Sequence, residues 1–175
     1  MLNNELIQDA LQKMDRELLS HCVQAKSIAT VVGKELNLDI RLLETAALLH
    51  DIGKILIPQS VLNKPGSLTE IEREVVDLHS YIGYHILKDM DFDDEICEIV
   101  LYHHGRDKPA LKPKPPLKEK AELYADVLRT IDAYDALTSD RPYRDKYTEE
   151  EAIQILKHDT YSNVQVLAVL EKYKP

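Results

Sequence analysis

Apolar residues recur along most of the chain at spacings of three and four, which is the period of an amphipathic helix. No segment shows a sustained alternation of apolar and polar residues, the mark of a half-buried strand. The clearest apolar stripe lies in a helix predicted over about residues 15–36. Its members are Leu18, Cys22, Ala25, Ala29, Val32 and Leu36. The pattern predicts an all-α protein.

Helix-capping residues and turn signals indicate where the next helices begin. Asp39 is a suitable N-cap for a second helix, which ends on His50. The sequence NKPGSLTEIE contains a turn, and Thr69 and Glu72 follow with the spacing of a capping box. The helix that starts there is expected to continue to about Met90.

The second half of the chain repeats this organisation around one loop. A short helix is predicted from near Asp93 into the sequence VLYHHG. The segment 105–118 is rich in proline and lysine and is predicted to be a loop, because proline lacks an N–H donor and disfavours helix before it. Helix resumes near Glu119, and Thr148 and Glu151 form the capping box of a further helix.

The composition is that of a globular chain with one core. The chain has 175 residues, of which 44% are hydrophobic and 30% charged, so we expect a single domain over residues 1–175. No apolar run approaches the ~18 residues needed to span a bilayer. The first residues are polar and acidic, unlike a secretion signal. These features predict a cytoplasmic protein with no membrane partner.

The two cysteines and the net charge narrow the range of possible functions. Cys22 and Cys97 lie among apolar neighbours, which favours packed free thiols over a disulfide. The formal net charge of -9 argues against binding to duplex nucleic acid, which depends on neutralising phosphates with Lys and Arg. A phosphorylated ligand would therefore need local positive charge.

Histidines and aspartates occupy the inward edges of successive predicted helices. They are His21, His50, Asp51, His79, His103, His104 and Asp132. Taken singly, each is better explained as a hydrogen-bonded core residue. Together, without a shared cation, they would leave unpaired polar groups that cost roughly 1 to 3 kcal/mol each. Imidazole with carboxylate suits iron, manganese, zinc or a similar transition metal better than calcium, and two metal ions fit the number of ligands.

The motifs around these residues resemble the HD-domain metal-dependent phosphohydrolases, and among them the HD-GYP branch that hydrolyses cyclic di-GMP. The similarity runs from about Glu17 to Ile155. The matching motifs are LLHDIGK at 48–54, VLNKPGSLTEIE at 61–72, GYHIL from 83, HH at 103–104 and IDAYDALTSDRPYR at 131–144. The resemblance implies an HD-domain helical bundle.

The resemblance also implies roles for individual residues. It makes His21, His50, Asp51, His79, His103, His104 and Asp132 the metal ligands, with Asp51 bridging and Glu17 available to a further metal. Asp51 and Lys54 would be catalytic, and Lys54, Arg141 and Arg144 would bind substrate phosphate. Two or three divalent transition metal ions are implied, with iron or manganese expected and zinc, nickel or magnesium open. Metal-activated water would attack the phosphodiester.

The segment after the paired histidines departs from the pattern of the HD-GYP branch. Gly105 follows the paired histidines where Glu is expected, and no Gly-Tyr-Pro sequence occurs after it. We therefore expect a phosphodiesterase acting on a cyclic dinucleotide, with cyclic di-GMP as the first candidate. The alternatives are an HD phosphohydrolase for another nucleotide or cyclic nucleotide, and a catalytically silent HD signalling or binding module. A regulatory protein partner is compatible with each.

Overall fold

The computed structural model describes residues 4–106, 116–139 and 145–173, and within these ranges the chain contains helices and connections but no strand. The predicted all-α fold is confirmed. The helices are α1 (Asn4–Leu11), α2 (Arg16–Glu35), α3 (Ile40–Leu49), the 3-10 helix η1 (Ile52–Leu56), α4 (Gln59–Leu62), α5 (Glu70–Asp77), α6 (His79–Asp89), α7 (Asp94–Tyr102), α8 (Glu119–Thr138), α9 (Glu149–Lys157) and α10 (Val164–Leu170).

The predicted caps begin the helices as expected. Asp39 accepts a hydrogen bond from the Leu42 N–H at the start of α3. Thr69 forms a complete capping box with Glu72 at the start of α5, and Thr148 forms another at the start of α9. Each of these side chains satisfies an N–H group that the helix itself leaves unpaired.

The helix expected to run from residue 70 to about Met90 is in fact two helices, and that prediction is wrong in this respect. The interruption is at Leu78, between α5 and α6. The Leu78 N–H bonds to the Val75 carbonyl, and the His79 imidazole donates from Nδ1 to the Val76 carbonyl at 2.6 Å. The Val76 carbonyl, in the last turn of α5, thus accepts a hydrogen bond from the His79 side chain, and His79 is the first residue of α6.

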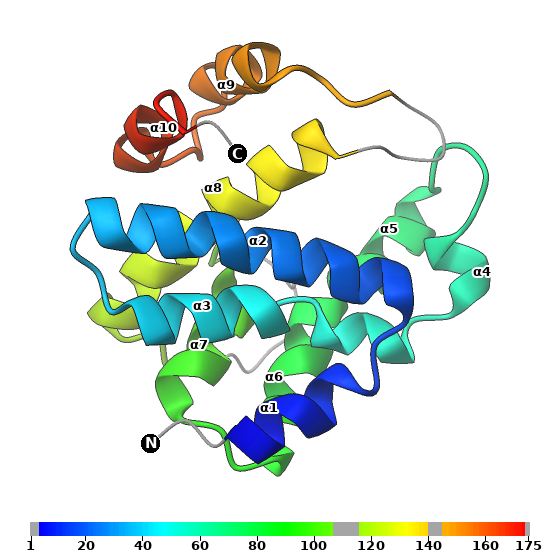
Figure 1. The fold of residues 1–175 in the computed structure, drawn as a ribbon. Helices are drawn as coiled ribbons and strands as arrows, with labels where there is room; N and C mark the ends of the chain where they lie inside the picture. The colour runs from blue at the N-terminus through cyan, green and yellow to red at the C-terminus, as the bar shows by residue number, and fades with distance from the viewer. Residues whose placement is uncertain (1–3, 107–115, 140–144, 174–175) are drawn as a thin grey trace.

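The core forms where the helices pack face to face. In Figure 1, α2 and α3 run antiparallel beside each other, and α9 and α10 lie together at one end next to α8. The bulkiest fully buried apolar side chains come from α2, α3, η1, α6, α7, α8 and α10. They are Ile28, Leu43, Leu49, Ile52, Leu87, Ile96, Ile99, Leu101, Leu128, Ile131 and Leu170. Full burial of such a side chain is worth about 1.5–3 kcal/mol before the entropy cost of folding.

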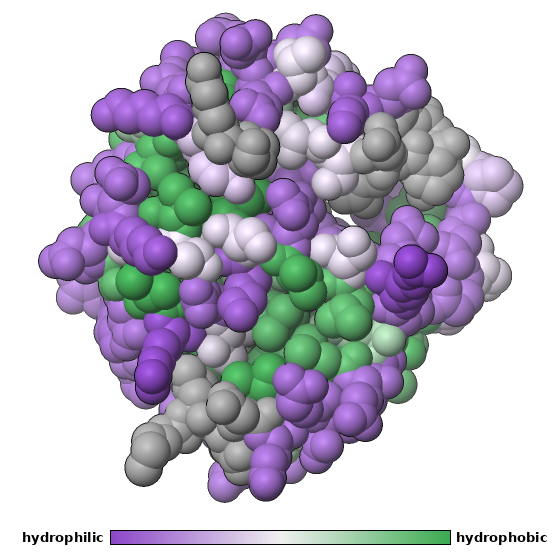
Figure 2. Space-filling view, viewed as in Figure 1, coloured by the Kyte–Doolittle hydropathy of each residue, from purple (hydrophilic) through white to green (hydrophobic). Residues whose placement is uncertain are grey.

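The two predicted free thiols are confirmed as buried. Cys22 and Cys97 are both fully covered and form no disulfide. On the face shown in Figure 2, apolar surface occurs as separate patches among polar residues. No helix in the described part of the chain has the length and apolar character required to cross a membrane. The single-domain organisation stays a prediction.

A close backbone contact fixes η1 against α6. A Cβ atom placed on Gly53 would lie 1.9 Å from the His79 carbonyl oxygen and 2.6 Å from the Gly83 nitrogen. No side chain fits there, so glycine lets the two backbones touch. This contact brings the residues just before η1 next to the first residue of α6.

Candidate metal centre

The seven side chains expected as metal ligands converge from five places in the fold. His21 comes from the second turn of α2, His50 and Asp51 from the end of α3, and His79 from the start of α6. The paired histidines follow α7, and Asp132 lies on α8. Three groups of nearby ligand atoms result, namely His79 with His103 and His104, His21 with His50 and Asp132, and His50 with Asp51 and His103.

Three of the histidines are held by their own main chain. Each donates from Nδ1 to the carbonyl three residues earlier, over 2.6 to 2.8 Å. The pairs are His50 with Ala47, His79 with Val76 and His103 with Val100. A neutral imidazole that donates from Nδ1 carries a lone pair on Nε2. The local hydrogen bond therefore sets both the tautomer and the direction of each ring.

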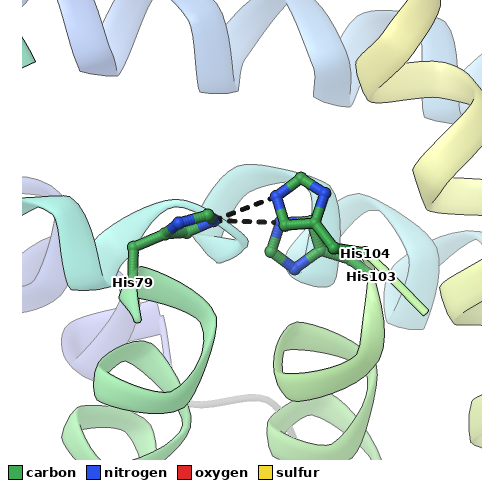
Figure 3. Close-up of side chains that lie close together, drawn as sticks. All are labelled: His79, His103 and His104. Carbon is green, nitrogen blue, oxygen red and sulfur yellow. Dashed lines mark hydrogen bonds between the residues drawn. The ribbon is translucent and has the colours of Figure 1, made fainter. Parts of the chain in front are cut away.

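The first group contains lone pairs that face one another. His79 Nε2 lies 3.3 Å from His103 Nε2 and 3.2 Å from His104 Nε2, the contacts drawn as dashed lines in Figure 3. His79 and His103 both donate from Nδ1, so in their neutral forms two acceptors face each other. Burial lowers the pKa of His79 to about 4, and burial together with the neighbouring imidazoles lowers the pKa of His103 well below its usual value. Both pKa shifts favour the neutral imidazole, and a cation would satisfy all three nitrogens.

The second group combines imidazole with carboxylate. His21 Nε2 lies 3.2 Å from His50 Nε2 and 3.2 Å from Asp132 Oδ1. Burial lowers the pKa of His21, but hydrogen bonds to Asp132 and Asp135 raise it by more, so the pKa lies above its usual value. Burial likewise lowers the pKa of His50, but nearby Asp51 and Asp132 raise it by more, so that the pKa lies well above its usual value. The carboxylates therefore attract positive charge to this group.

Asp51 lies between the two groups and faces both. Its Oδ1 is 3.3 Å from His79 Nε2, and its Oδ2 is 3.5 Å from the Nε2 atoms of both His21 and His50. The residue is 1% exposed. Burial raises the pKa of Asp51, but Lys54, His50 and His79 lower it further, so that it lies well below its ordinary value. A buried carboxylate with one oxygen toward each group is suited to bridge two cations.

Beside this cluster the surface opens into a cleft of about 990 Å³. His21, Asp51 and Lys54 line its inner part, and the N-terminal half of α2, α4 and residues 61–68 form its walls. Lys54 donates to Asp51 Oδ2 over 2.5 Å, and its side chain is 27% exposed. The volume is at the upper end of typical small-molecule sites. A ligand in the cleft would meet both the cluster and an ammonium group.

Not every expected site residue joins the cluster. Glu17 lines the cleft one turn before His21, but it is exposed and belongs to none of the three groups, so its role as a ligand stays a prediction. Arg141 and Arg144 lie outside the described residues, as does most of the proline-rich and lysine-rich segment.

One residue of the site was not assigned from the sequence. The His21 Nδ1 atom lies 2.5 Å from Asp135 Oδ2, and Asp135 is 1% exposed. The sequence signal was its spacing, since Asp135 follows Asp132 by three residues and thus lies on the same helix face. Nothing in that spacing identifies which ring nitrogen it contacts.

The donor set fits transition metal ions. Five imidazoles and two carboxylates offer nitrogen and oxygen ligands, and calcium prefers oxygen alone. The facing Nε2 lone pairs of His79 and His103, 3.3 Å apart, are donors of the kind that a transition metal ion accepts. The described residues therefore suit a pair of divalent ions that share Asp51.

Comparison with known proteins identifies the family of this chain. A sequence model of the HD domain family matches residues 18–137, and the chain belongs to the HD domain family. It is 40% identical to the cyclic di-GMP phosphodiesterase response regulator RpfG of Xanthomonas campestris, over 74% of this chain and 35% of that protein. It is 34% identical to the cyclic di-GMP phosphodiesterase PA4108 of Pseudomonas aeruginosa, over 82% of this chain and 36% of that protein. The chain thus spans about a third of the length of these relatives.

Two solved structures share the fold. The HD domain of the phosphodiesterase PgpH of L. monocytogenes, in complex with cyclic-di-AMP, superposes with a TM-score of 0.67 and 20% identity, covering 98% of this chain and 95% of that one. Bd1817 of Bdellovibrio bacteriovorus, described as an HDG"Y"P protein, gives a TM-score of 0.68 and 20% identity, covering 89% and 51%. The expected HD-domain helical fold is confirmed.

Proposed function

We propose that this chain is a two-metal phosphodiesterase that hydrolyses a cyclic dinucleotide, with cyclic di-GMP as the first substrate to test. The single observation that carries the proposal is the position of Asp51, with one oxygen toward His79 and the other toward His21 and His50. The relatives named as cyclic di-GMP phosphodiesterases support the choice of substrate.

The two histidine groups would hold one ion each. His79, His103 and His104 would hold the first, and His21, His50 and Asp132 the second, with Asp51 shared between them. Paired divalent ions supply Lewis acidity, which lowers the pKa of a coordinated water toward about 7 and draws charge from phosphoryl oxygens. We expect iron or manganese, with zinc, nickel and magnesium as the other ions to test. A third ion would need Glu17, which lies outside both groups.

The cationic side chains would hold the substrate. Lys54 lines the cleft next to Asp51, where its ammonium group can reach a phosphate oxygen. Arg141 and Arg144 are proposed to bind phosphate through their planar guanidinium groups. These charges would offset the net charge of -9, which repels an anionic substrate. We place this activity in the cytoplasm.

Hydrolysis of a substrate panel tests the proposal. Metal-loaded protein is incubated with cyclic di-GMP, other cyclic dinucleotides, cyclic mononucleotides, nucleoside monophosphates and a generic aryl phosphodiester. We expect cyclic dinucleotides to be cleaved and the Asp51→Ala variant to be inactive. Equal background rates for wild type and variant on every substrate would refute catalysis and favour a binding module.

A second cyclic dinucleotide, 3'3'-cGAMP, is a specific alternative to cyclic di-GMP as the substrate. Gly105 replaces the Glu expected after the paired histidines, and the chain lacks Gly-Tyr-Pro, so the base contacts can differ from those of the branch. A relative in Vibrio cholerae is named 3'3'-cGAMP-specific phosphodiesterase 1 and is 29% identical over 79% of this chain and 33% of that protein. Faster cleavage of 3'3'-cGAMP than of cyclic di-GMP in the same panel would select that substrate.

A further inference from the structure

His21 is held differently from the three histidines that bond to their own main chain. It lies in the second turn of α2, where the main-chain carbonyls accept helical hydrogen bonds. Its Nδ1 instead meets a side chain 114 residues further along, Asp135 Oδ2, at 2.5 Å. The orientation of this ring therefore depends on tertiary structure.

Asp135 is itself fixed in place. The residue is 1% exposed, and Ser139 donates from Oγ to its other oxygen, Oδ1, over 3.2 Å. The Ser139 N–H also bonds to the Asp135 carbonyl at the end of α8. A buried carboxylate is costly unless it is paired or hydrogen-bonded, and these contacts use both of its oxygens.

The contact with Asp135 determines what His21 can do at Nε2. When Nδ1–H donates to a carboxylate, the lone pair is on Nε2, which points toward Asp132 Oδ1 and His50 Nε2 at 3.2 Å each. A carboxylate behind a metal-binding imidazole fixes its tautomer and increases its basicity as a ligand. The other histidine group has backbone carbonyls in this place, at His79 and His103, and a carbonyl carries no full negative charge.

We propose that Asp135 is a positioning residue that strengthens metal binding at the group of His21, His50 and Asp132, and leaves the group of His79, His103 and His104 unaffected. The inference rests on the proposed two-metal function and adds an asymmetry to it. One of the two metal positions depends on a buried negative charge behind its histidine, and the other does not.

The test measures metal binding directly, with Mn²⁺ as the only ligand. Metal-stripped wild type, Asp135→Asn and the control Asp126→Asn are titrated, and free Mn²⁺ is followed by electron paramagnetic resonance. Asn keeps the shape of the side chain but removes its charge. We expect Asp135→Asn to weaken one of two Mn²⁺ equivalents by about 10- to 100-fold and leave the other unchanged. Asp126 lies on the same helix with a half-exposed side chain paired to Arg129, so Asp126→Asn should bind as wild type does.

A double-mutant cycle separates positioning from a general structural effect. If Asp135 acts through His21, then in a His21→Ala background the change Asp135→Asn should have no further effect on Mn²⁺ affinity. A similar loss with and without His21, or weakening of both Mn²⁺ equivalents to the same degree, would overturn the inference. Unchanged Mn²⁺ affinity in Asp135→Asn would overturn it while leaving the proposed function intact. No Mn²⁺ binding by wild type would refute both.

Discussion

The Nε2 atoms of His79 and His103 lie 3.3 Å apart in a buried site, and both rings already donate from Nδ1 to a backbone carbonyl. Two neutral imidazoles in this arrangement present lone pairs to each other. Such a contact is unfavourable without a cation, and it becomes favourable when a metal ion accepts both nitrogens. The pair therefore connects the local geometry of two helix ends to the chemistry proposed for the whole site.

Replacement of His79 should abolish activity, whereas replacement of a neighbouring histidine should not. His79→Gln removes one of three facing nitrogens. Loss of a residue that only hydrogen-bonds to a metal ligand typically lowers activity about 10- to 100-fold, and loss of a ligand itself should lower it further. His85 lies on the same helix α6, is exposed, and its ring contacts those of Tyr81 and Tyr84. His85→Gln is the matched control and should retain full activity. Comparable rates of phosphodiester hydrolysis in the two variants would contradict the assignment.

Lys54 should affect turnover without affecting metal content. Its ammonium group lines the cleft beside Asp51, and loss of one such electrostatic contact to a reacting phosphate costs about 10²- to 10³-fold in kcat. We expect Lys54→Met to show this loss and still bind two Mn²⁺ ions. Lys88→Met, which alters a surface ion pair with Asp94, serves as the control. A Lys54→Met variant with wild-type kcat would exclude a role in the reaction.

Gly53→Ala should damage both stability and the site. A Cβ atom at this position meets the His79 carbonyl oxygen at 1.9 Å, so η1 must move away from α6. Overpacking costs about 1–3 kcal/mol, and a value at the upper end is expected because the contact is with backbone. Thermal unfolding and Mn²⁺ binding should both be impaired. Gly33→Ala is the control, because its nearest contact is at 3.4 Å with the Ile40 side chain. Equal melting temperatures for the two variants would show that the close contact is unimportant.

The capping box at the start of α5 should contribute to stability in a pH-dependent way. Hydrogen bonds from Lys64 and Thr69 lower the pKa of Glu72 from 4.5 to about 2. Because the folded-state pKa is the lower one, this contribution is present above pH 4.5 and is lost as the pH falls toward 2. Glu72→Gln should therefore lower the melting temperature by a few degrees at pH 7.

The difference between Glu72→Gln and wild type should shrink as the solution is acidified below pH 4.5 and disappear below pH 2. Glu70→Gln, in the same first turn of α5, is the control and should show little change at either pH. A Glu72→Gln effect that is constant from pH 7 to pH 2, or that grows on acidification, would contradict the linkage.

Much of the fold was predictable because its signals are local. The spacing of apolar residues identifies α2, and the caps at Asp39, Thr69 and Thr148 each satisfy N–H groups within three residues. The break at Leu78 was not predictable from periodicity, because the apolar pattern continues across it. It arises from the His79 side chain, whose hydrogen bond takes a carbonyl of the preceding turn.

The site was predictable in its members but not in its connections. Eight ligand candidates follow from residue type, position and family resemblance, and the structure brings seven of them together, while Glu17 lies outside the three groups. The role of Asp135 could not be read in the same way, because it depends on which nitrogen of His21 faces α8. That direction is set by the packing of α2 against α8, which no local pattern in either helix specifies.

The number of metal ions bound per chain tests the central claim most directly. Metal-stripped protein is titrated with Mn²⁺ to saturation, with Asp51→Ala beside it, and bound metal is counted. We predict two ions per chain in wild type, a rise in melting temperature as they bind, and fewer bound ions in the variant because the shared carboxylate is gone. Wild-type protein that binds no Mn²⁺, iron or zinc at saturating concentration would contradict the account.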